Sequence, residues 1–338
     1  MRRKKKEETV ESELIQLEGI GPVSLKKLNG AGIFNLVDFA VRSPHEIASL
    51  LGYKDEMQAE QWQMLAKGEL AKSGEIPKQE MTCYELLEYR SKIPRIRTNT
   101  TFDKIFSDMN SPNGGIEAEA ITELYGEFGS GKTQICHTLV VECIKQLNKS
   151  VLWIDGEVTF RPERIVEIAI IRGYATDKED AMNKFFPFIE IRNCVDSTSV
   201  ITTLNTTHKL IKEKNIGLVI CDGLTGKFRE EYIGRGELGA RQDQLKIFMS
   251  RLFNLAHIMR VFVVMTNQVL SNPGQLFGDP NKPMGGHIIG HMSTYRVYLT
   301  KSGKTERIAT FVDSSGHARV QERFFLTKAG ISDVEVVK

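Results

Sequence analysis

The stretch from Gly126 to Leu139, GEFGSGKTQICHTL, constrains the fold of this chain more than any other. Residues 121–125, just before it, alternate apolar and polar side chains as a strand does. After it, apolar residues recur at helical spacing, at positions 135, 139, 140 and 143. The glycine-rich stretch therefore joins a strand to a helix.

The spacing within this stretch predicts a phosphate-binding loop. Gly126 and Gly131 frame four residues and are followed by Lys132 and Thr133, the pattern Gly-x-x-x-x-Gly-Lys-Thr. Glycines let successive backbone N–H groups converge on phosphate oxygens, and the N-terminus of the next helix adds partial positive charge. Lys132 is expected to reach the β- and γ-phosphates, and the Thr133 hydroxyl is expected to bind Mg²⁺. The alternative is a flexible glycine turn that happens to end in Lys-Thr, and the flanking strand and helix argue against it. The predicted nucleotide-binding residues are Gly126, Glu127, Phe128, Gly129, Ser130, Gly131, Lys132, Thr133 and Gln134.

Strand-like and helix-like segments alternate from residue 121 onward. VLWID, FFPFIEIR, GLVICD and VFVVMTNQ are short and nearly continuous in apolar residues, and segments with helical periodicity separate them. This pattern predicts an α/β fold, a mainly parallel sheet covered by helices on both faces. YRVYLTK, ERIATFVD and ERFFLT then follow without intervening helices. They predict an antiparallel extension at one edge of the sheet.

Residues 1–72 are expected to form a small all-α domain, with residues 1–11 disordered. LEGIGPVSLKKL resembles a helix-hairpin-helix, whose Gly-x-Gly turn can present backbone amides to a DNA phosphate. SLLGYKDEMQAEQWQML is a second, degenerate copy. These glycines either contact DNA or only form turns in a small helical bundle, and the sequence does not favour one alternative over the other. KSGEIPKQE suits a linker, so we place the linker at residues 73–97 and the core domain at residues 98–338.

Composition limits the partners and the location of this 338-residue chain. Its 45 basic and 43 acidic residues nearly cancel, so any nucleic-acid surface must be local, and the run Arg2 to Lys6 is interpreted as a solvated tail. No segment approaches the roughly eighteen consecutive apolar residues of a membrane span, and the N-terminus lacks the apolar stretch of a signal peptide. An intracellular, cytoplasmic protein without membrane contact is expected. The five cysteines show no metal-ligand spacing and are expected to be reduced thiols.

Polar residues at the ends of three predicted strands are candidates for the remaining chemistry. Asp222 ends GLVICD, the position at which a carboxylate can help to bind Mg²⁺ beside the Thr133 hydroxyl. Glu157 follows VLWID and either orients the water that attacks the γ-phosphate or is a solvent-facing charge; the residues alone leave both open. Gln268 ends VVMTNQ and has a neutral side chain able to hydrogen-bond the γ-phosphate.

Five motifs together carry a family resemblance: ELYGEFGSGKTQ, FRPERI, EYIGRGELGARQ, TNQV and GDPNKPMGGHIIGH. They resemble the RadA-type strand-exchange recombinases, which are RecA-type ATPases with ATP and Mg²⁺ as cofactors, and the resemblance covers nearly the whole chain. It implies that Lys132 and Thr133 bind the nucleotide, that Glu157 activates the hydrolytic water, and that Asp222 is the Walker B aspartate, a ligand of the metal together with Thr133. It also implies that Gln268 links the γ-phosphate to the DNA-binding loops. Catalysis would then rest on Glu157, Lys132 and Gln268.

The resemblance implies two DNA-binding loops, Arg229 to Arg241 and Val269 to Gly286. The first places arginines among glycines, a mobile basic segment suited to a phosphate backbone; by composition alone, an ordinary surface loop is equally open. The composition of the second predicts disorder until a ligand holds it. The implied DNA-binding residues are Arg229, Arg235, Arg241, Phe277, Gly285 and Gly286.

Several segments depart from the family pattern. The family's Asp-Thr-Glu-Gly/Asn-Thr-Phe reads DGEVTF at residues 155–160, and the serine after the Walker B aspartate is Gly223. The family's linker motif Phe-x-x-Ala, which docks into the neighbouring subunit, has Glu80 and Cys83 at its two positions, and Met81 is left to fill the pocket. The segment that covers the neighbour's ATP reads DSSGHAR at residues 313–319, without the family's prolines and final acid.

These features predict a DNA-dependent ATPase that acts as a recombinase in DNA repair. It would form filaments or rings of identical subunits on single-stranded DNA, pair that strand with homologous double-stranded DNA and exchange strands. The alternative is a recombinase paralogue that binds ATP and DNA as a mediator without exchanging strands. A more distant alternative is another RecA-type ATPase motor.

Overall fold

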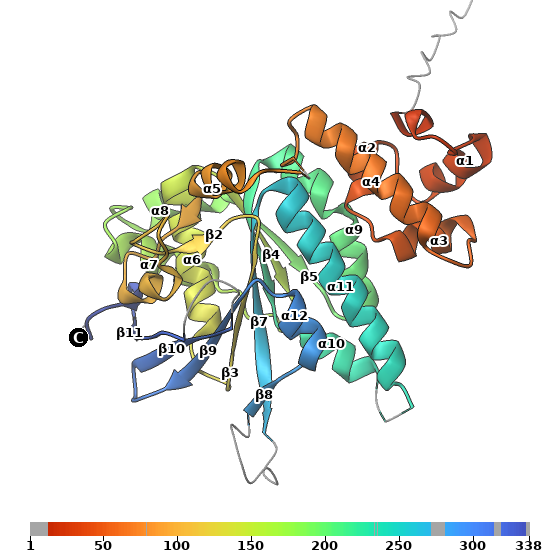
Figure 1. The fold of residues 1–338 in the computed structure, drawn as a ribbon. Helices are drawn as coiled ribbons and strands as arrows, with labels where there is room; N and C mark the ends of the chain where they lie inside the picture. The colour runs from red at the N-terminus through yellow and green to blue at the C-terminus, as the bar shows by residue number, and fades with distance from the viewer. Residues whose placement is uncertain are drawn as a thin grey trace, which may run out of the picture. The chain divides into compact units, whose positions relative to one another are not determined.

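The computed structural model describes residues 13–78, 80–232, 234, 236–271, 281–313 and 319–335. The chain divides into two compact units, the first ending at Met81 and the second beginning at Thr82 (Figure 1). The expected linker, residues 73–97, is thus divided between the two units. Among the described residues, no helix has both the length and the apolar character needed to cross a membrane.

The first unit is helical. Its core contains Leu14, Leu28, Phe39 and Trp62, all almost fully buried. The Trp62 indole N–H donates to the Glu18 carbonyl at 2.8 Å, which fixes the turn at Glu18 against the helix that carries Trp62. The helices are η1 (Glu13–Gln16), α1 (Pro22–Gly30), α2 (Leu36–Ala40), α3 (Pro44–Leu51) and α4 (Met57–Lys72).

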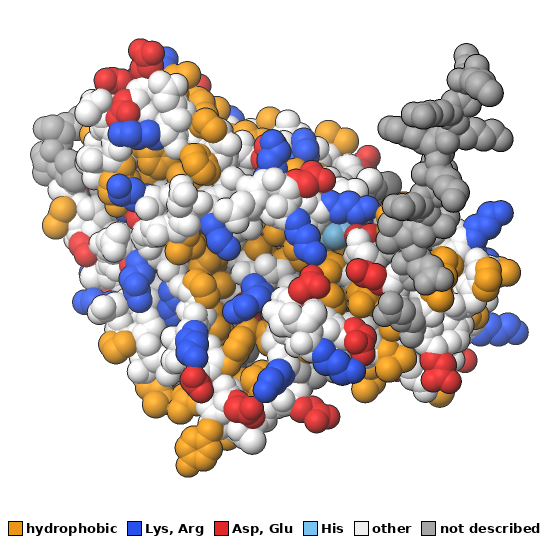
Figure 2. Space-filling model, turned by 90° about the horizontal axis from the view of Figure 1, so that it is seen from above, with side chains coloured by type: hydrophobic (Ala, Val, Ile, Leu, Met, Phe, Trp, Pro, Cys, Tyr) orange, Lys and Arg blue, Asp and Glu red, His pale blue; other side chains and the backbone are white. Residues whose placement is uncertain are grey.

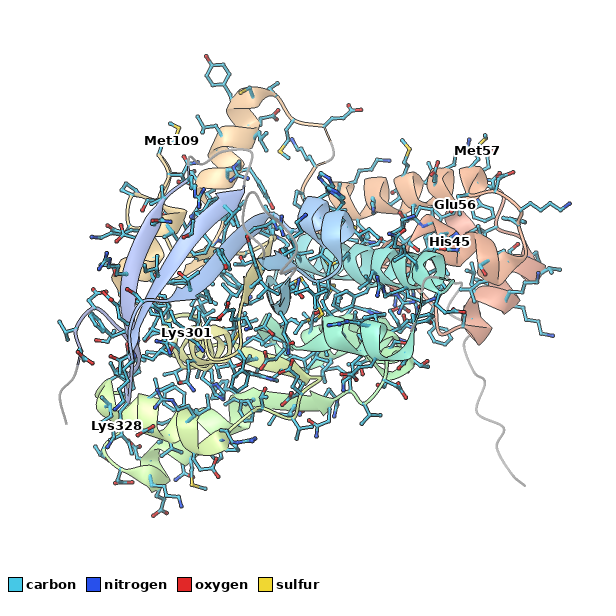
Figure 3. All side chains as sticks on the ribbon, turned by 90° about the horizontal axis from the view of Figure 1, so that it is seen from below. His45, Glu56, Met57, Met109, Lys301 and Lys328 are labelled. Carbon is cyan, nitrogen blue, oxygen red and sulfur yellow. The ribbon has the colours of Figure 1, made fainter. Side chains whose placement is uncertain are left out.

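Local signals determine where α3 begins and ends. Ser43 and Glu46 form a capping box at its start, and Gly52 takes the left-handed conformation, φ 81°, that ends it. His45 Nδ1 lies 2.8 Å from Glu56 Oε1, which joins α3 to the residues before α4 (Figure 3). Both side chains are largely exposed, so this contact adds little to stability.

The second unit is built on a ten-stranded sheet within the described residues, and the predicted α/β fold is confirmed. The order is β12-β11-β10-β9-β3-β7-β6-β4-β5, with β8 paired to β7 beside this path. The strands are β3 (Ile121–Gly126), β4 (Ser150–Asp155), β5 (Ile189–Asn193), β6 (Ile216–Asp222), β7 (Phe262–Ser271), β8 (Asn281–Pro283), β9 (Tyr295–Lys301), β10 (Glu306–Asp313), β11 (Gln321–Thr327) and β12 (Gly330–Ser332). A separate pair joins β1 (Arg95–Ile96) to β2 (Ile116–Glu117).

Helices cover both faces of this sheet (Figure 1). One hydrophobic core includes residues of α6 (Lys132–Leu147), α7 (Pro162–Ile171) and α8 (Lys178–Phe185). The other includes residues of α9 (Ser197–Lys214), α10 (Leu224–Glu231) and α11 (Leu238–Met259). The remaining helices are α5 (Cys83–Ser91), η2 (Thr101–Phe106), η3 (Phe186–Phe188) and α12 (Gly286–Met292).

The antiparallel extension begins one strand later than predicted. Tyr295–Lys301, β9, runs parallel to β3 on one side and antiparallel to β10 on the other, and β11 and β12 continue the antiparallel pairing. The reason is α12, a short helix that the sequence interpretation missed. It lies between β8 and β9 and helps return the chain so that β9 starts in the same direction as β3.

Basic and acidic side chains are interspersed over the face of the molecule shown in Figure 2. This distribution matches the nearly equal numbers of basic and acidic residues in the chain. A nucleic-acid surface must therefore be sought in particular segments rather than in the charge of the whole chain.

Candidate nucleotide and DNA site

The phosphate loop lies at the carboxyl end of β3, which pairs with the parallel strands β9 and β7 on its two sides. A Cβ on Gly126 would stand 2.3 Å from the Leu299 carbonyl oxygen, so only glycine fits between β3 and β9. Gly129 and Gly131 have φ of +73° and +102°, which glycine adopts without strain. The loop then opens α6 directly, so that its amides and the helix N-terminus face the same space.

Lys132 folds back over this loop. Its ammonium donates to the carbonyl oxygens of Gly126, at 2.8 Å, and Glu127, at 2.9 Å. Burial lowers the pKa of Lys132, and the nearby carboxylates of Glu157 and Asp222 oppose that effect. A phosphate group would offer this ammonium a stronger partner than two neutral carbonyls.

The other predicted loop residues differ in their surroundings. Phe128 is 93% exposed at the tip, whereas the Ser130 hydroxyl is buried and has no hydrogen-bond partner among the described residues. Gln134 accepts a hydrogen bond from Arg164 at 2.8 Å. Arg307, which the sequence interpretation did not select, donates to the Gly129 carbonyl at 3.0 Å from β10. A buried hydroxyl without a partner, next to the N–H groups of the loop backbone, suits an anion such as a phosphate.

The predicted metal ligands lie together. The Thr133 hydroxyl is 3.2 Å from one carboxylate oxygen of Asp222, and burial raises the pKa of that carboxyl. Thr266 and Thr159 donate to the two Asp222 oxygens at 2.5 and 2.7 Å. The donors are all oxygens, which fits a hard cation such as Mg²⁺. In the described part of the chain no group of three His, Cys, Asp or Glu residues suits a metal, so an ion here would need ligands from phosphate or water.

Glu157 and Gln268 come together at the same edge of the sheet. Parallel pairing sets Asp155 opposite Asp222 and Gly126 opposite Gln268, so these residues lie at the same edge of the sheet. The Gln268 amide donates to Glu157 Oε1 at 2.7 Å. Asp155 supports this pair, because its carboxylate accepts the Glu157 N–H at 3.1 Å and caps the turn. The structure therefore groups all the residues predicted for nucleotide chemistry.

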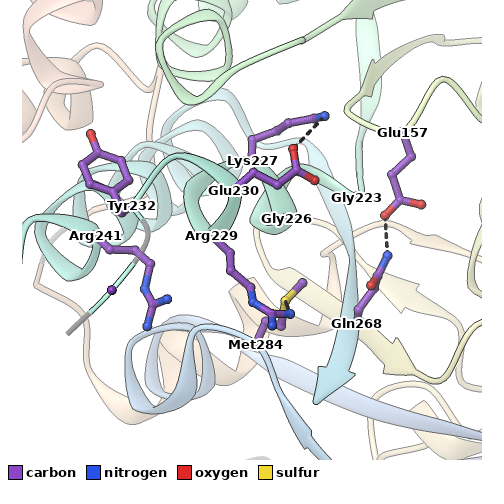
Figure 4. A pocket seen from close by; sticks show the side chains of 11 residues that line it. Glu157, Gly223, Gly226, Lys227, Arg229, Glu230, Tyr232, Arg241, Gln268 and Met284 are labelled. Atoms are coloured by element: carbon purple, nitrogen blue, oxygen red, sulfur yellow. Dashed lines mark hydrogen bonds and ion pairs between the residues drawn. The ribbon is translucent and has the colours of Figure 1, made fainter. Parts of the chain in front are cut away.

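The first predicted DNA loop is shorter than expected. Arg229 lies in α10 and Arg241 in α11, because helical hydrogen bonding continues into both ends of the segment. Both side chains line a cavity of about 490 Å³ whose other wall contains Glu157 and Gln268 (Figure 4). Arg235 lies outside the described residues.

The second predicted loop is ordered at its base, which corrects the prediction of disorder there. Strand β7 continues to Ser271 and pairs with β8, with Val269 opposite Pro283. Gly285 and Gly286, with φ of 80° and 54°, form the start of α12. Phe277 lies outside the described residues. The cavity and the loop base place the predicted DNA segments next to the nucleotide site.

Comparison with known proteins identifies the family. The family model described as Rad51 matches residues 89–334. The chain belongs to the Rad51 family. It is 40% identical to the DNA repair and recombination protein RadA of Cenarchaeum symbiosum over 96% of this chain and 79% of that protein. It is 37% identical to the protein of the same name from Methanocorpusculum labreanum, over 94% and 97% of the two chains.

Two segments of this Rad51-family chain were expected at contacts between subunits. In the linker, Glu80 and Cys83 are exposed and Met81 is partly buried. The helix that follows, α5, buries none of its side chains, and Tyr84 on it is 88% exposed. In the segment expected to cover the neighbour's ATP, residues 314–318 lie outside the described residues.

Proposed function

We propose that this Rad51-family chain is an ATP-dependent DNA recombinase that forms filaments on single-stranded DNA, pairs it with homologous duplex DNA and exchanges strands. One observation carries the proposal. Gln268 donates to Glu157 beside the phosphate loop, and its strand, β7, continues directly into the second proposed DNA loop. A change at the γ-phosphate would thus reach a DNA-binding segment within a few residues. The printed names of the two relatives support this function.

Each side chain has a proposed role in ATP hydrolysis. Lys132 and the loop amides hold the phosphates, and Thr133 and Asp222 hold Mg²⁺. When bound, Mg²⁺ supplies positive charge that offsets the charge on the phosphoryl oxygens. Glu157 orients the attacking water, and Gln268 hydrogen-bonds the γ-phosphate.

The existing contacts of these residues indicate how the site would respond to ATP. The Lys132 ammonium would exchange its two loop carbonyls for phosphate oxygens. The Gln268 amide would turn from Glu157 to the γ-phosphate, which releases the carboxylate for water. In both changes the moving side chain exchanges one hydrogen-bond partner for another, so neither donor is left unpaired.

The proposed DNA contacts are Arg229, Arg235, Arg241 and the second loop, including Phe277, Gly285 and Gly286. Arginines bind phosphates without regard to base sequence, as a recombinase must. Single- and double-stranded DNA and further copies of the chain are the proposed partners. Because genomic DNA is the proposed substrate, we propose that the protein acts in the cytoplasm.

Homologous pairing tests this proposal. Purified protein with ATP and Mg²⁺ should hydrolyse ATP faster with single-stranded DNA and should join that strand to a homologous supercoiled duplex. Lys132→Ala should lose both activities, whereas Lys178→Ala, an exposed lysine at the start of α8, should keep both. DNA-stimulated hydrolysis without pairing would instead identify the mediator, and no stimulation by DNA would contradict the proposal.

A further inference from the structure

Two glycines bring the ends of β4 and β6 into close contact next to the proposed catalytic pair. The Gly156 N–H donates to the Asp222 carbonyl at 2.9 Å. A Cβ on Gly156 would lie only 3.1 Å from the Gly223 carbonyl oxygen. Gly223 in turn donates its N–H to the Thr266 hydroxyl at 2.9 Å. The backbone at this point is therefore fixed from two sides.

Gly223 adopts a backbone conformation that other residues avoid, and its missing side chain leaves a space that Glu157 fills. Its φ is +70°, in the left-handed region. A Cβ built on it would stand 2.4 Å from Cγ and 2.6 Å from Oε1 of Glu157. Real Cβ atoms do not approach other atoms so closely. Any other residue at this position must therefore displace the Glu157 side chain.

The turn that carries Glu157 is itself constrained to this geometry. Val158 has φ +56°, which is rare for a β-branched residue and costs of order 1–3 kcal/mol. Asp155 accepts the N–H groups of Glu157 and Phe160, at 3.1 and 2.9 Å, and so holds the turn closed. The surrounding contacts thus keep Glu157 directed at Gly223 and Gln268.

We propose that Gly223 is a positioning residue for ATP hydrolysis: the space left by its absent side chain sets where the Glu157 carboxylate sits relative to Gln268. Gly223 acts through Glu157 and has no side chain to offer the nucleotide. The inference rests on the proposed role of Glu157. It also implies that a serine after Asp222, the residue usual in the family, would not be accommodated in this chain's arrangement.

Steady-state kinetics of two variants test the proposal. Gly223→Ala adds a Cβ, and Gly223→Asn adds one while tolerating the left-handed backbone. In both, kcat for DNA-stimulated ATP hydrolysis should fall at least about tenfold, as expected for a misplaced catalytic group, while KM for ATP and the affinity for ADP stay within about twofold. Gly173→Ala is the matched control, because Gly173 has φ +73° and open space where a Cβ would be. Its kcat should equal that of the wild type.

A double-mutant cycle distinguishes action through Glu157 from general damage. Gly223→Ala should cause no further loss of kcat in the Glu157→Gln background, because the group that it displaces has already been disabled. Losses that multiply, or a wild-type kcat in both Gly223 variants, would overturn the inference. A wild-type rate in Glu157→Gln alone would instead contradict the proposed function. The two failures are therefore separable.

Discussion

His137 offers a quantitative test of how the nucleotide site is held together. It lies one helical turn after Thr133 in α6, with Nδ1 2.8 Å from the Thr133 carbonyl oxygen. Its Nε2 accepts the N–H of Arg161 at 3.2 Å, just beyond the turn that carries Glu157. The carbonyl requires a proton on Nδ1 and the amide requires a lone pair on Nε2, so this histidine must be neutral. Protonation would break the link between α6 and the turn.

The lowered pKa of His137 shows how strongly the free energy of unfolding should depend on pH. Burial lowers that pKa from its ordinary 6.5 to about 4. The unfolded chain therefore binds more protons than the folded one between these two values. The free energy of unfolding is unaffected above pH 6.5 and falls as the pH drops toward 4. At roughly 1.4 kcal/mol per pKa unit, the loss is on the order of 3 kcal/mol.

Urea unfolding of the wild type and His137→Gln, followed by tryptophan fluorescence, measures this pH-dependent part of the free energy of unfolding. Trp153 reports the local transition because its ring lies 4.8 Å from that of His137. At about pH 7.5 the variant should have the lower free energy of unfolding. The difference between the two proteins should shrink by a few kcal/mol at about pH 4.5, because glutamine at position 137 cannot take up a proton. His45→Gln, an exposed histidine of the first unit, is the control. A deficit in His137→Gln that does not change with pH would refute the reasoning.

Three further predictions concern the proposed site and the linker. Lys132→Ala should weaken ATP binding by about 2 kcal/mol, the contribution of a charged hydrogen bond, whereas Glu157→Gln should bind ATP normally and hydrolyse it slowly. A wild-type rate of hydrolysis in Glu157→Gln would disprove the proposed role of Glu157 in activating water. Replacing Arg229 and Arg241 with alanine should reduce the dependence of single-stranded DNA binding on salt: the slope of log affinity against log salt concentration, measured by fluorescence anisotropy, should fall by about 1.4. An unchanged slope would show that these arginines do not contact the DNA. Met81→Asp should convert the protein to monomers in sedimentation experiments, because a charge would replace an apolar interface residue that contributes about 2 kcal/mol to subunit association. Unchanged assembly of this variant would show that another residue anchors the interface.

The sequence predicted the parts of the site that depend on spacing along the chain and on strand ends. The glycine spacing around Lys132 is local, and it specifies both the turn after β3 and the start of α6. Parallel strands end at one edge, which is why Asp222, Glu157 and Gln268, far apart in the sequence, lie together in the structure. The strand ends marked these three residues as candidates, and the family resemblance was needed to assign roles to Glu157 and Gln268.

Contacts between side chains and distant backbone were not predictable in this way. His137 and Thr159 look like ordinary residues of a helix and a turn, and only the folded chain shows their bonds to Arg161 and Asp222. A weak signal existed for Thr266, a polar residue inside an apolar strand two positions before Gln268. The parallel direction of β9 was missed because α12 is too short to give a clear helical period.

Strand exchange between a circular single strand and a homologous linear duplex tests the central claim most directly. With ATP and Mg²⁺ the wild type should produce joint molecules and then nicked circular duplex, and Lys132→Ala should produce neither. Heterologous duplex should give no product with either protein. If the wild type binds single-stranded DNA and hydrolyses ATP but yields no joint molecules with homologous duplex, the recombinase account is contradicted.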